Sequence, residues 1–103
     1  MPYATDDIPL PCNAAAAIVA MNAGWVRLTF RKANGETVTR LGTRNLSIIC
    51  RYGSMRDSDL IQQADEWGDN ILYWDFARGD IRSFCRIDLI ELAIPDSAPE
   101  LNH

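Results

Sequence analysis

The sequence has little of what most enzymes and metal sites require. Its single histidine, His103, is the last of 103 residues, and it has no glycine-rich phosphate loop or nucleophile elbow. A serine or cysteine nucleophile needs a base to deprotonate it, and a structural zinc site needs about four nitrogen or sulfur ligands. We therefore expect no catalytic activity, no metal and no cofactor.

Cysteine and long apolar runs are also scarce. The three cysteines, Cys12, Cys50 and Cys85, are an odd number at wide spacings, which is typical of reduced packing residues. No run approaches the roughly 18 apolar residues of a membrane span. The alanine-rich run 14–23 follows two aspartates and no Lys or Arg, the wrong charge for a secretion signal. We expect a cytoplasmic protein with no membrane contact.

Charge of both signs is present but unevenly placed. The net charge is -4, yet residues 1–50 hold five basic side chains against three acids, and residues 51–103 hold five against eleven. Such a split indicates either an unevenly charged solvated surface or a domain with a basic and an acidic side. With 48% hydrophobic and 23% charged residues, the chain is predicted to form one globular domain.

A short helix is predicted near the N-terminus, after a proline-containing irregular arm. Asn13 is suited to cap this helix at its start, and Gly24 to follow its end. We expect the helix to be an appendage of the main domain. The predicted division of the chain is an arm and helix at 1–24, a β domain at 25–94 with an insertion at about 54–70, and a flexible tail at 95–103.

The first of two predicted β-hairpins follows the helix. Leu28 and Phe30 alternate with polar residues ahead of Asn34-Gly35, a pair that two-residue hairpin loops prefer. Residues whose numbers sum to 69 would then face each other, which sets Leu28 opposite Leu41.

The second predicted hairpin has Arg78-Gly79 as a two-residue loop, which sets Asp75 opposite Arg82. Further strands are predicted at 46–52 and at about 90–94, after a bend at 87–89.

The insertion between the hairpins breaks the strand pattern. Apolar residues recur there at helical spacing: Leu60, Ile61, Ala64 and Trp67. Asp57 or Ser58 is suited to cap a short amphipathic helix, and Gly68 to end it.

Five to six short strands joined by tight turns favour a mainly β fold. Because closure removes exposed strand edges, we predict a small SH3- or Sm-like barrel of antiparallel strands with a short N-terminal helix and one helical insertion.

The predicted register gathers basic residues and an indole on the outer face of the first hairpin. These residues are Trp25, Arg27, Arg31, Arg40 and Arg44. Guanidinium groups neutralise phosphates and an indole stacks on a base, so such a face would bind nucleic acid or an anionic ligand. The alternative is the ordinary solvated face of an antiparallel sheet.

The insertion carries the opposite charge. Its acids are Asp57, Asp59, Asp65, Glu66 and Asp69. They lack the register of a calcium-binding loop, and no second feature supports carboxylate catalysis. They form either a solvated helix face or an acidic surface that binds a basic protein by imitating the charge of DNA.

Two runs, "FRKANGETVTRLGTRNL" and "YWDFARGDIRSFCRIDLIEL", resemble the WYL-like family with an Sm-like SH3 barrel that occurs in bacteria and phages. The most specific matching segments are Asn34-Gly35, 42–45, 73–75 and 82–84, and the similarity covers roughly residues 28–94. Related WYL domains are thought to bind nucleic acids or small ligands. The resemblance therefore implies four site residues: Tyr73, Trp74, Arg82 and Phe84. Cys85 departs from the family pattern, because a second arginine is expected there.

Together these features predict a non-enzymatic phage or bacterial binding module, regulatory in role, that binds nucleic acid or an anionic ligand. The alternative is a small acidic phage inhibitor that blocks a host nucleic-acid-acting defence complex, in the manner of an anti-CRISPR protein. An Sm-like barrel can also pair its edges into a homo-oligomer.

Overall fold

The computed structural model describes residues 7–66 and 68–96. Trp67, residues 1–6 of the predicted arm and residues 97–103 of the predicted tail, with His103, lie outside the described residues. The elements are β1 (Ile8–Leu10), α1 (Ala14–Ala23), β2 (Val26–Arg31), β3 (Thr37–Thr43), α2 (Leu46–Tyr52), α3 (Met55–Gln63), β4 (Asn70–Asp75), β5 (Asp80–Cys85), a 3-10 turn (Arg86–Asp88) and β6 (Leu89–Ile94). No described helix is long and apolar enough to cross a membrane.

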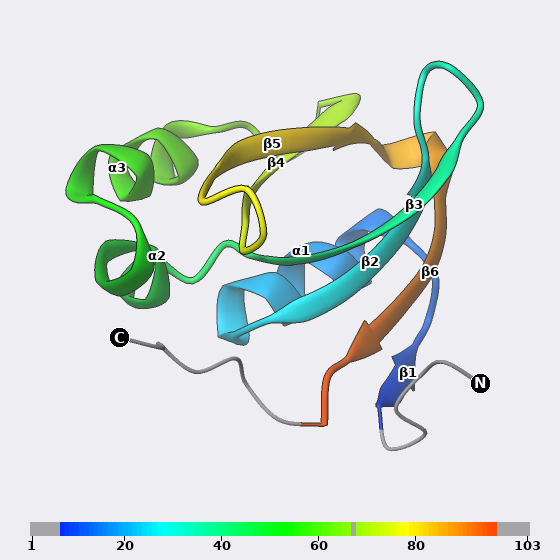
Figure 1. Ribbon diagram of the computed structural model, residues 1–103, viewed down its shortest axis with the longest axis horizontal. Coiled ribbons are helices and arrows are strands. Elements are labelled where there is room, and N and C mark those ends of the chain that lie inside the picture. Colours follow the sequence, from blue (N-terminus) through cyan, green and yellow to red (C-terminus); the bar gives the residue numbers. More distant parts are fainter. Residues whose placement is uncertain (1–6, 67, 97–103) are drawn as a thin grey trace.

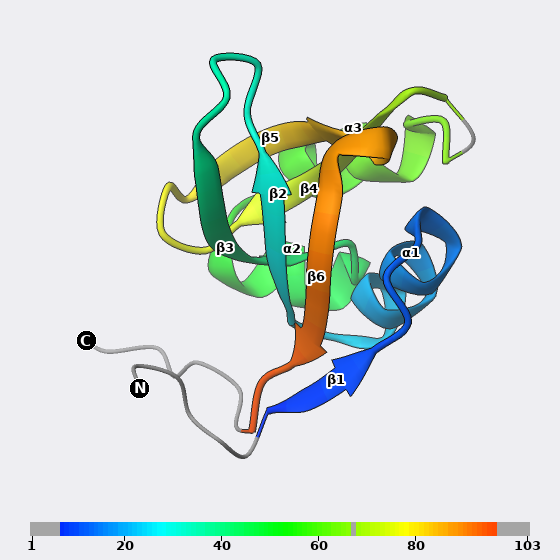
Figure 2. The same ribbon diagram turned by 90° about the vertical axis from the view of Figure 1, so that its right-hand side faces the viewer.

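All six strands form one antiparallel sheet in the order β1-β6-β2-β3-β4-β5. Strands β3 and β4 pair at only two positions, so the sheet bends there, and the β4–β5 pair lies above β2, β3 and β6 in Figure 1. Figure 2 shows β6, β2 and β3 side by side, with β1 across the lower end of β6. The predicted small, mainly β, barrel-like fold with a helical insertion is confirmed.

Helix α1 has the predicted ends but not the predicted role. The Asn13 side chain accepts a hydrogen bond from the Ala16 N–H at 2.8 Å, and the Gly24 N–H donates to the Ala20 carbonyl at 3.0 Å. Ala17 and Met21 are fully buried in the main core, together with side chains of β2, β4, β5 and β6. The expectation of an appendage is therefore wrong, because the small alanine side chains let α1 pack closely on the sheet.

The segment 46–52 was predicted to be a strand, and this prediction is wrong. It is helix α2, whose first turn is capped by the Asn45 side chain accepting from the Ile48 N–H at 3.0 Å. A short apolar run fits a buried strand or a buried helix equally well by period alone, so the capping residue decides. The helical insertion accordingly begins at residue 46 rather than at about 54.

Helix α3 begins earlier than predicted. The Ser54 hydroxyl, rather than Asp57 or Ser58, caps it by accepting from the Asp57 N–H at 3.1 Å. Its helical hydrogen bonds stop at Gln63, before Gly68. Helices α2 and α3 lie beside the sheet at the left of Figure 1 and cover a second core. The buried side chains of that core are Trp25, Ile49, Ile61 and Trp74.

The first hairpin has a longer loop than predicted. The Lys32 N–H donates to the Glu36 carbonyl at 2.8 Å, and Gly35 takes a positive φ of 89°. Leu28 therefore faces Arg40 instead of Leu41. Because side chains alternate between faces, this shift of one residue moves Arg40 from the predicted outer face to the inner face that Leu28 shares.

The second hairpin also has a longer loop, of residues 76–79. Asp75 faces Asp80 rather than Arg82, and Tyr73 faces Arg82. The predicted pairing of Asp75 with Arg82 is therefore wrong. Because the shift is two residues, every side chain of β5 keeps its predicted face.

Gly42 is the place where β3 passes closest to the Tyr73 ring. A Cβ atom at Gly42 would overlap Tyr73 Cδ2 and approach Cε2 to 2.9 Å. Tyr73 is 1% exposed and has no room to turn away. We expect Gly42→Ala to lower the free energy of unfolding by about 1–3 kcal/mol in urea denaturation.

The matched control is Gly24→Ala, because a Cβ at Gly24 meets nothing within 4 Å. We expect its cost to stay within about 0.5 kcal/mol. Equal costs for the two variants would contradict the close approach of β3 to Tyr73.

Candidate functional site

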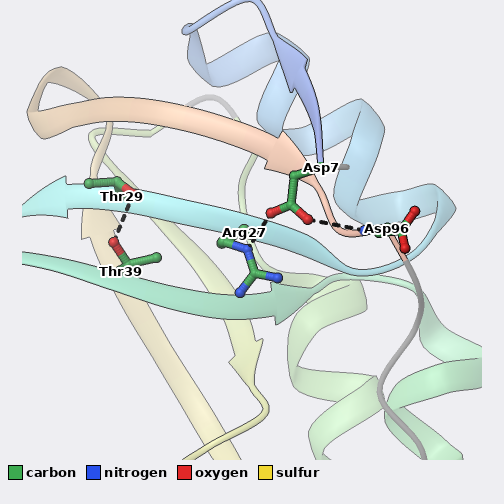
Figure 3. A network of polar contacts seen from close by, with 5 residues as sticks. All are labelled: Asp7, Arg27, Thr29, Thr39 and Asp96. Carbon is green, nitrogen blue, oxygen red and sulfur yellow. Dashed lines mark hydrogen bonds and ion pairs between the residues drawn. The ribbon is translucent and has the colours of Figure 1, made fainter. Parts of the chain in front are cut away.

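The basic face predicted for the first hairpin is divided by the observed register. Arg27 and Arg31 lie on the outer face of β2, but Arg40 lies on the inner face of β3. Figure 3 shows that Arg27 is already paired: its Nε donates to Asp7 Oδ2 at 2.7 Å. The other Asp7 oxygen accepts from the Asp96 N–H at 3.2 Å. Arg27 thus ties both ends of the described chain to the sheet.

Trp25 does not form a stacking platform. The side chain is 6% exposed, and its ring packs edge-on against Tyr52 at 5.3 Å and Phe76 at 5.4 Å. The prediction that Trp25 stacks on a ligand from an open face is therefore wrong. Helix α2 supplies Tyr52, so its misprediction as a strand also concealed the burial of this indole.

Arg44 is a structural residue rather than a surface cation. It is 3% exposed and donates to the backbone carbonyls of Leu72 on β4 and Ile61 on α3. Its Nη2 also lies 3.7 Å from a Glu66 carboxylate oxygen. Burial lowers the pKa of Arg44, and Glu66 opposes that shift. The guanidinium holds the helical layer to the sheet, so the predicted ligand-binding role is wrong.

The aromatic residues implied by the WYL-like resemblance belong to the cores. Tyr73, Trp74 and Phe84 are almost fully buried. The Phe84 ring stacks on Phe30 at 5.4 Å, and the Trp74 Nε1 donates to Asp57 Oδ2 at 3.0 Å. Of the four residues that the resemblance implied, only Arg82 is exposed.

The longer loops bring four cations together around one hollow. It measures about 190 Å³ and opens on the inner side of β3, β4 and β5. Four basic side chains line it: Lys32, Arg40, Arg78 and Arg82. Tyr73 and Asp75 line its buried part. We call this set of residues the cationic hollow.

Asp75 organises the cationic hollow from below. Its Oδ2 accepts from the Tyr73 hydroxyl at 3.3 Å and lies 3.8 Å from Arg40 Nε. Its Oδ1 accepts from the Arg78 N–H at 3.0 Å, which holds the 76–79 loop against the sheet. Four basic side chains and one carboxylate thus line the hollow, so the charge of its lining is positive. Lys32 is also paired outside the lining, with Glu36 Oε1 at 3.5 Å from its Nζ.

The Tyr73 hydroxyl remains protonated in this environment. Burial and the neighbouring Asp75 carboxylate raise the pKa of Tyr73 above its ordinary value, while Arg40 and Arg82 act in the opposite direction. Tyr73 therefore serves as a hydrogen-bond donor to Asp75, not as a base.

Sequence reasoning proposed Arg40 and Arg82 but missed Lys32 and Arg78. Both missed residues lie beside the hairpin loops, whose lengths were underestimated. The available signal was Gly35, because three-residue loops commonly end with a glycine of positive φ. That longer loop would have placed Arg40 on the inner face.

The predicted acidic surface is partly internal. Asp57 is bonded to Trp74, and Glu66 lies beside Arg44, whereas Asp59 and Asp69 are exposed. Asp57 and Asp65 both line a separate groove between α3 and β5. Across the described residues, no group of three or more His, Cys, Asp or Glu side chains is placed to hold a metal ion.

Comparisons of the chain with family models, curated proteins and solved structures found no match. The resemblance to the WYL-like family therefore stays a prediction. The cationic hollow is supported by its own geometry and charge.

The role assigned to Arg44 can be tested by truncation. We expect Arg44→Ala to lower the free energy of unfolding by roughly 3 kcal/mol, because two carbonyls lose a charged donor in a buried site. Arg31→Ala removes the same charge from an exposed position and should cost no more than about 0.5 kcal/mol. Denaturant unfolding of both variants measures the difference, and similar costs would show that Arg44 is not a clamp.

The pairing of Asp7 with Arg27 predicts a pH dependence. The hydrogen bond from Arg27 holds the pKa of Asp7 below its ordinary value of 3.8. A carboxylate with a lowered folded pKa stabilises the fold above its unfolded pKa, and this stabilisation disappears as the pH falls through the folded pKa. We expect Asp7→Asn to lower the Tm at pH 7. The difference in Tm between the variant and the native protein should shrink below pH 3.8.

Thermal unfolding followed by circular dichroism measures that gap at each pH. Arg27→Met is the control background, in which Asp7→Asn should have little effect at any pH. A gap that is constant with pH would rule out the ion pair as its cause.

Proposed function

We propose that the chain is a non-enzymatic binding module whose cationic hollow holds a phosphate group, carried by a nucleic-acid backbone or by a small anionic ligand. The observation that carries this proposal is the convergence of four cations on one hollow that contains a single carboxylate. These cations come from two strands and two loops, so only the folded chain gathers them.

The size of the hollow favours one anionic group over a whole small molecule. Drug-sized ligands occupy pockets of roughly 300–1,000 Å³. The cationic hollow offers about 190 Å³ and is open on one side. A phosphate fits this description, and guanidinium groups bind its oxygens in pairs.

The burial of the aromatic side chains favours contact with phosphate over contact with bases. Trp25, Tyr73, Trp74 and Phe84 are inside the cores, where no base can stack on them. Binding to nucleic acid would therefore depend on the backbone, with little sequence preference and a strong dependence on salt.

Arg40 and Arg82 have different parts in the proposed site. Arg40 is 28% exposed and is held near Asp75, so its position is set before a ligand arrives. Arg82 and Arg78 are exposed and free to turn toward an anion at the mouth of the hollow. Because Arg40 is already held in place, it loses little side-chain entropy when a ligand binds. Arg78 and Arg82 can adjust their positions to the ligand. A regulatory role in a phage or bacterium is supported by the family resemblance alone.

The test uses a fluorescein-labelled 12-nucleotide single strand, with pyrophosphate as competitor. We expect fluorescence anisotropy to show binding at low salt, and pyrophosphate to displace the strand. Each lost phosphate contact lowers the slope of log K against log salt by about 0.7 for single strands, so Arg40→Ala with Arg82→Ala should lower it by about 1.4.

Arg51→Ala is the matched control, because Arg51 is exposed on α2 and outside the hollow. It should leave the slope nearly unchanged. Pyrophosphate binding without binding of the strand would assign the hollow to a small ligand. Absence of both at low salt, or equal losses for Arg51→Ala and Arg40→Ala, would overturn the proposal.

A further inference from the structure

Strand β5 ends the sheet, and its outer edge has no partner strand among the described residues. The Phe76 N–H donates to the Leu41 carbonyl of β3. Backbone groups alternate in direction along a strand, so those of Asp75 and Tyr73, one and three positions earlier, point toward β5. Their partners Arg82 and Asp80 therefore use their backbone groups inward. By the same alternation, the backbone N–H and C=O groups of Ile81, Ser83 and Cys85 point away from β4, toward the open edge of the sheet.

One of these outward N–H groups, that of Ile81, is already bonded to the side chain of its neighbour Asp80. The Ile81 N–H donates to the Asp80 side chain at 2.7 Å, a bond between neighbouring residues that an inward N–H would not need. Ser83 and Cys85 follow along the same edge. The edge thus presents the row of donors and acceptors to which another strand adds.

An apolar groove runs beside this edge. It has a volume of about 370 Å³ and lies between α3 and β5. Leu60, Leu72 and Ile81 provide its apolar surface, and Leu60 is 43% exposed although it is a large aliphatic side chain. A strand added at β5 would direct every second side chain over these residues.

The charge of the groove selects a basic occupant. Three carboxylates line it, from Asp57, Asp65 and Asp80, against the single cation of Arg56. The opposite face of β5 has the reverse character, because Arg82 lines the cationic hollow there. A complementary strand would carry lysine or arginine with apolar residues on its groove face and no cations on its other face.

We propose that β5 and this groove bind an extended basic segment of a partner protein, which pairs with the β5 edge as an additional strand. Its central apolar side chains pack on Leu60 and Ile81, and its flanking cations meet the acidic rim. The groove shares no lining residue with the cationic hollow, although Ser83 of the β5 edge also borders the hollow. The proposal goes beyond the phosphate-binding function.

A second copy of the chain fits this edge less well. If two β5 strands paired antiparallel, the two sheets would join into one, and the same face of each copy would lie on the same side of it. The acidic groove of one copy would then adjoin that of the other, and the two cationic hollows would adjoin on the opposite face. Like charges side by side disfavour such a dimer.

The probe is the capped heptapeptide Lys-Thr-Val-Thr-Val-Thr-Lys, in which lysine and valine share one face of a strand. We expect binding at low ionic strength, with slower hydrogen exchange of the Ser83 and Cys85 amides by NMR. Replacing both lysines by glutamate should weaken binding about tenfold or more.

Ser83→Pro removes an outward donor at an edge, where proline is tolerated, and should weaken binding of the peptide at least about tenfold. Ser83→Val keeps the N–H and is the matched control, with affinity close to that of the native chain. If Ser83→Pro does not fold, Leu60→Ser tests the groove instead, because Leu60 is partly exposed and tolerant of change.

Three outcomes would overturn the proposal. They are no binding of the heptapeptide, equal binding to Ser83→Pro and Ser83→Val, and self-association of the free chain that Ser83→Pro abolishes in sedimentation. Arg40→Ala should leave peptide binding unchanged, so failure here and failure of the phosphate site are told apart.

Discussion

Strand β4 is buried on both faces, and the positions of both proposed sites depend on this constraint. Ile71 and Tyr73 point into the core that α1 completes, and Trp74 points into the core under α2 and α3. A slip of one residue would exchange these side chains between two differently shaped cores, so the register is strongly specified. Strand β5 is paired along β4 and inherits that register. Its two faces are thereby assigned to different surroundings.

Asp75 connects this constraint to the cationic hollow. A carboxylate in the buried end of β4 must be paired and hydrogen-bonded, because an isolated buried charge is costly. Arg40, the Tyr73 hydroxyl and the Arg78 N–H meet that requirement. The same contacts hold a guanidinium and a loop at the mouth of the hollow. Part of the positive charge around the hollow therefore stabilises the fold, and the proposed phosphate site would use the same charge.

Local signals in the sequence were sufficient for some elements and insufficient for others. The ends of α1 were predictable because the capping hydrogen bonds of Asn13 and Gly24 are made to residues only three or four positions away. The burial of Trp25 was not, because it depends on a helical layer contributed by residues distant in the chain. Arg44 likewise finds its acceptors on α3 and β4, and no property of an arginine in a sequence reveals such partners.

The candidate site was predictable in its chemistry but not in its place. Arginines on the first hairpin were predicted to share one face, yet one extra loop residue sent Arg27 and Arg40 to opposite faces. The family resemblance implied that Tyr73, Trp74 and Phe84 are site residues, but their side chains are buried in the cores. Loop length, a small local quantity, therefore decided which cations share a site.

The uneven charge of the chain has a different structural meaning from the one its halves suggest. Lys32 and Arg40 come from the basic half, but Arg78 and Arg82 come from the acidic half and line the same hollow. The hollow and the acidic groove meet at β5, where Ile81 borders the groove and Arg82 the hollow. A strand can separate two charge environments by one residue, because neighbouring side chains point to opposite faces. The cationic hollow therefore draws on both halves of the sequence, whereas the acids of the groove come from the second half alone.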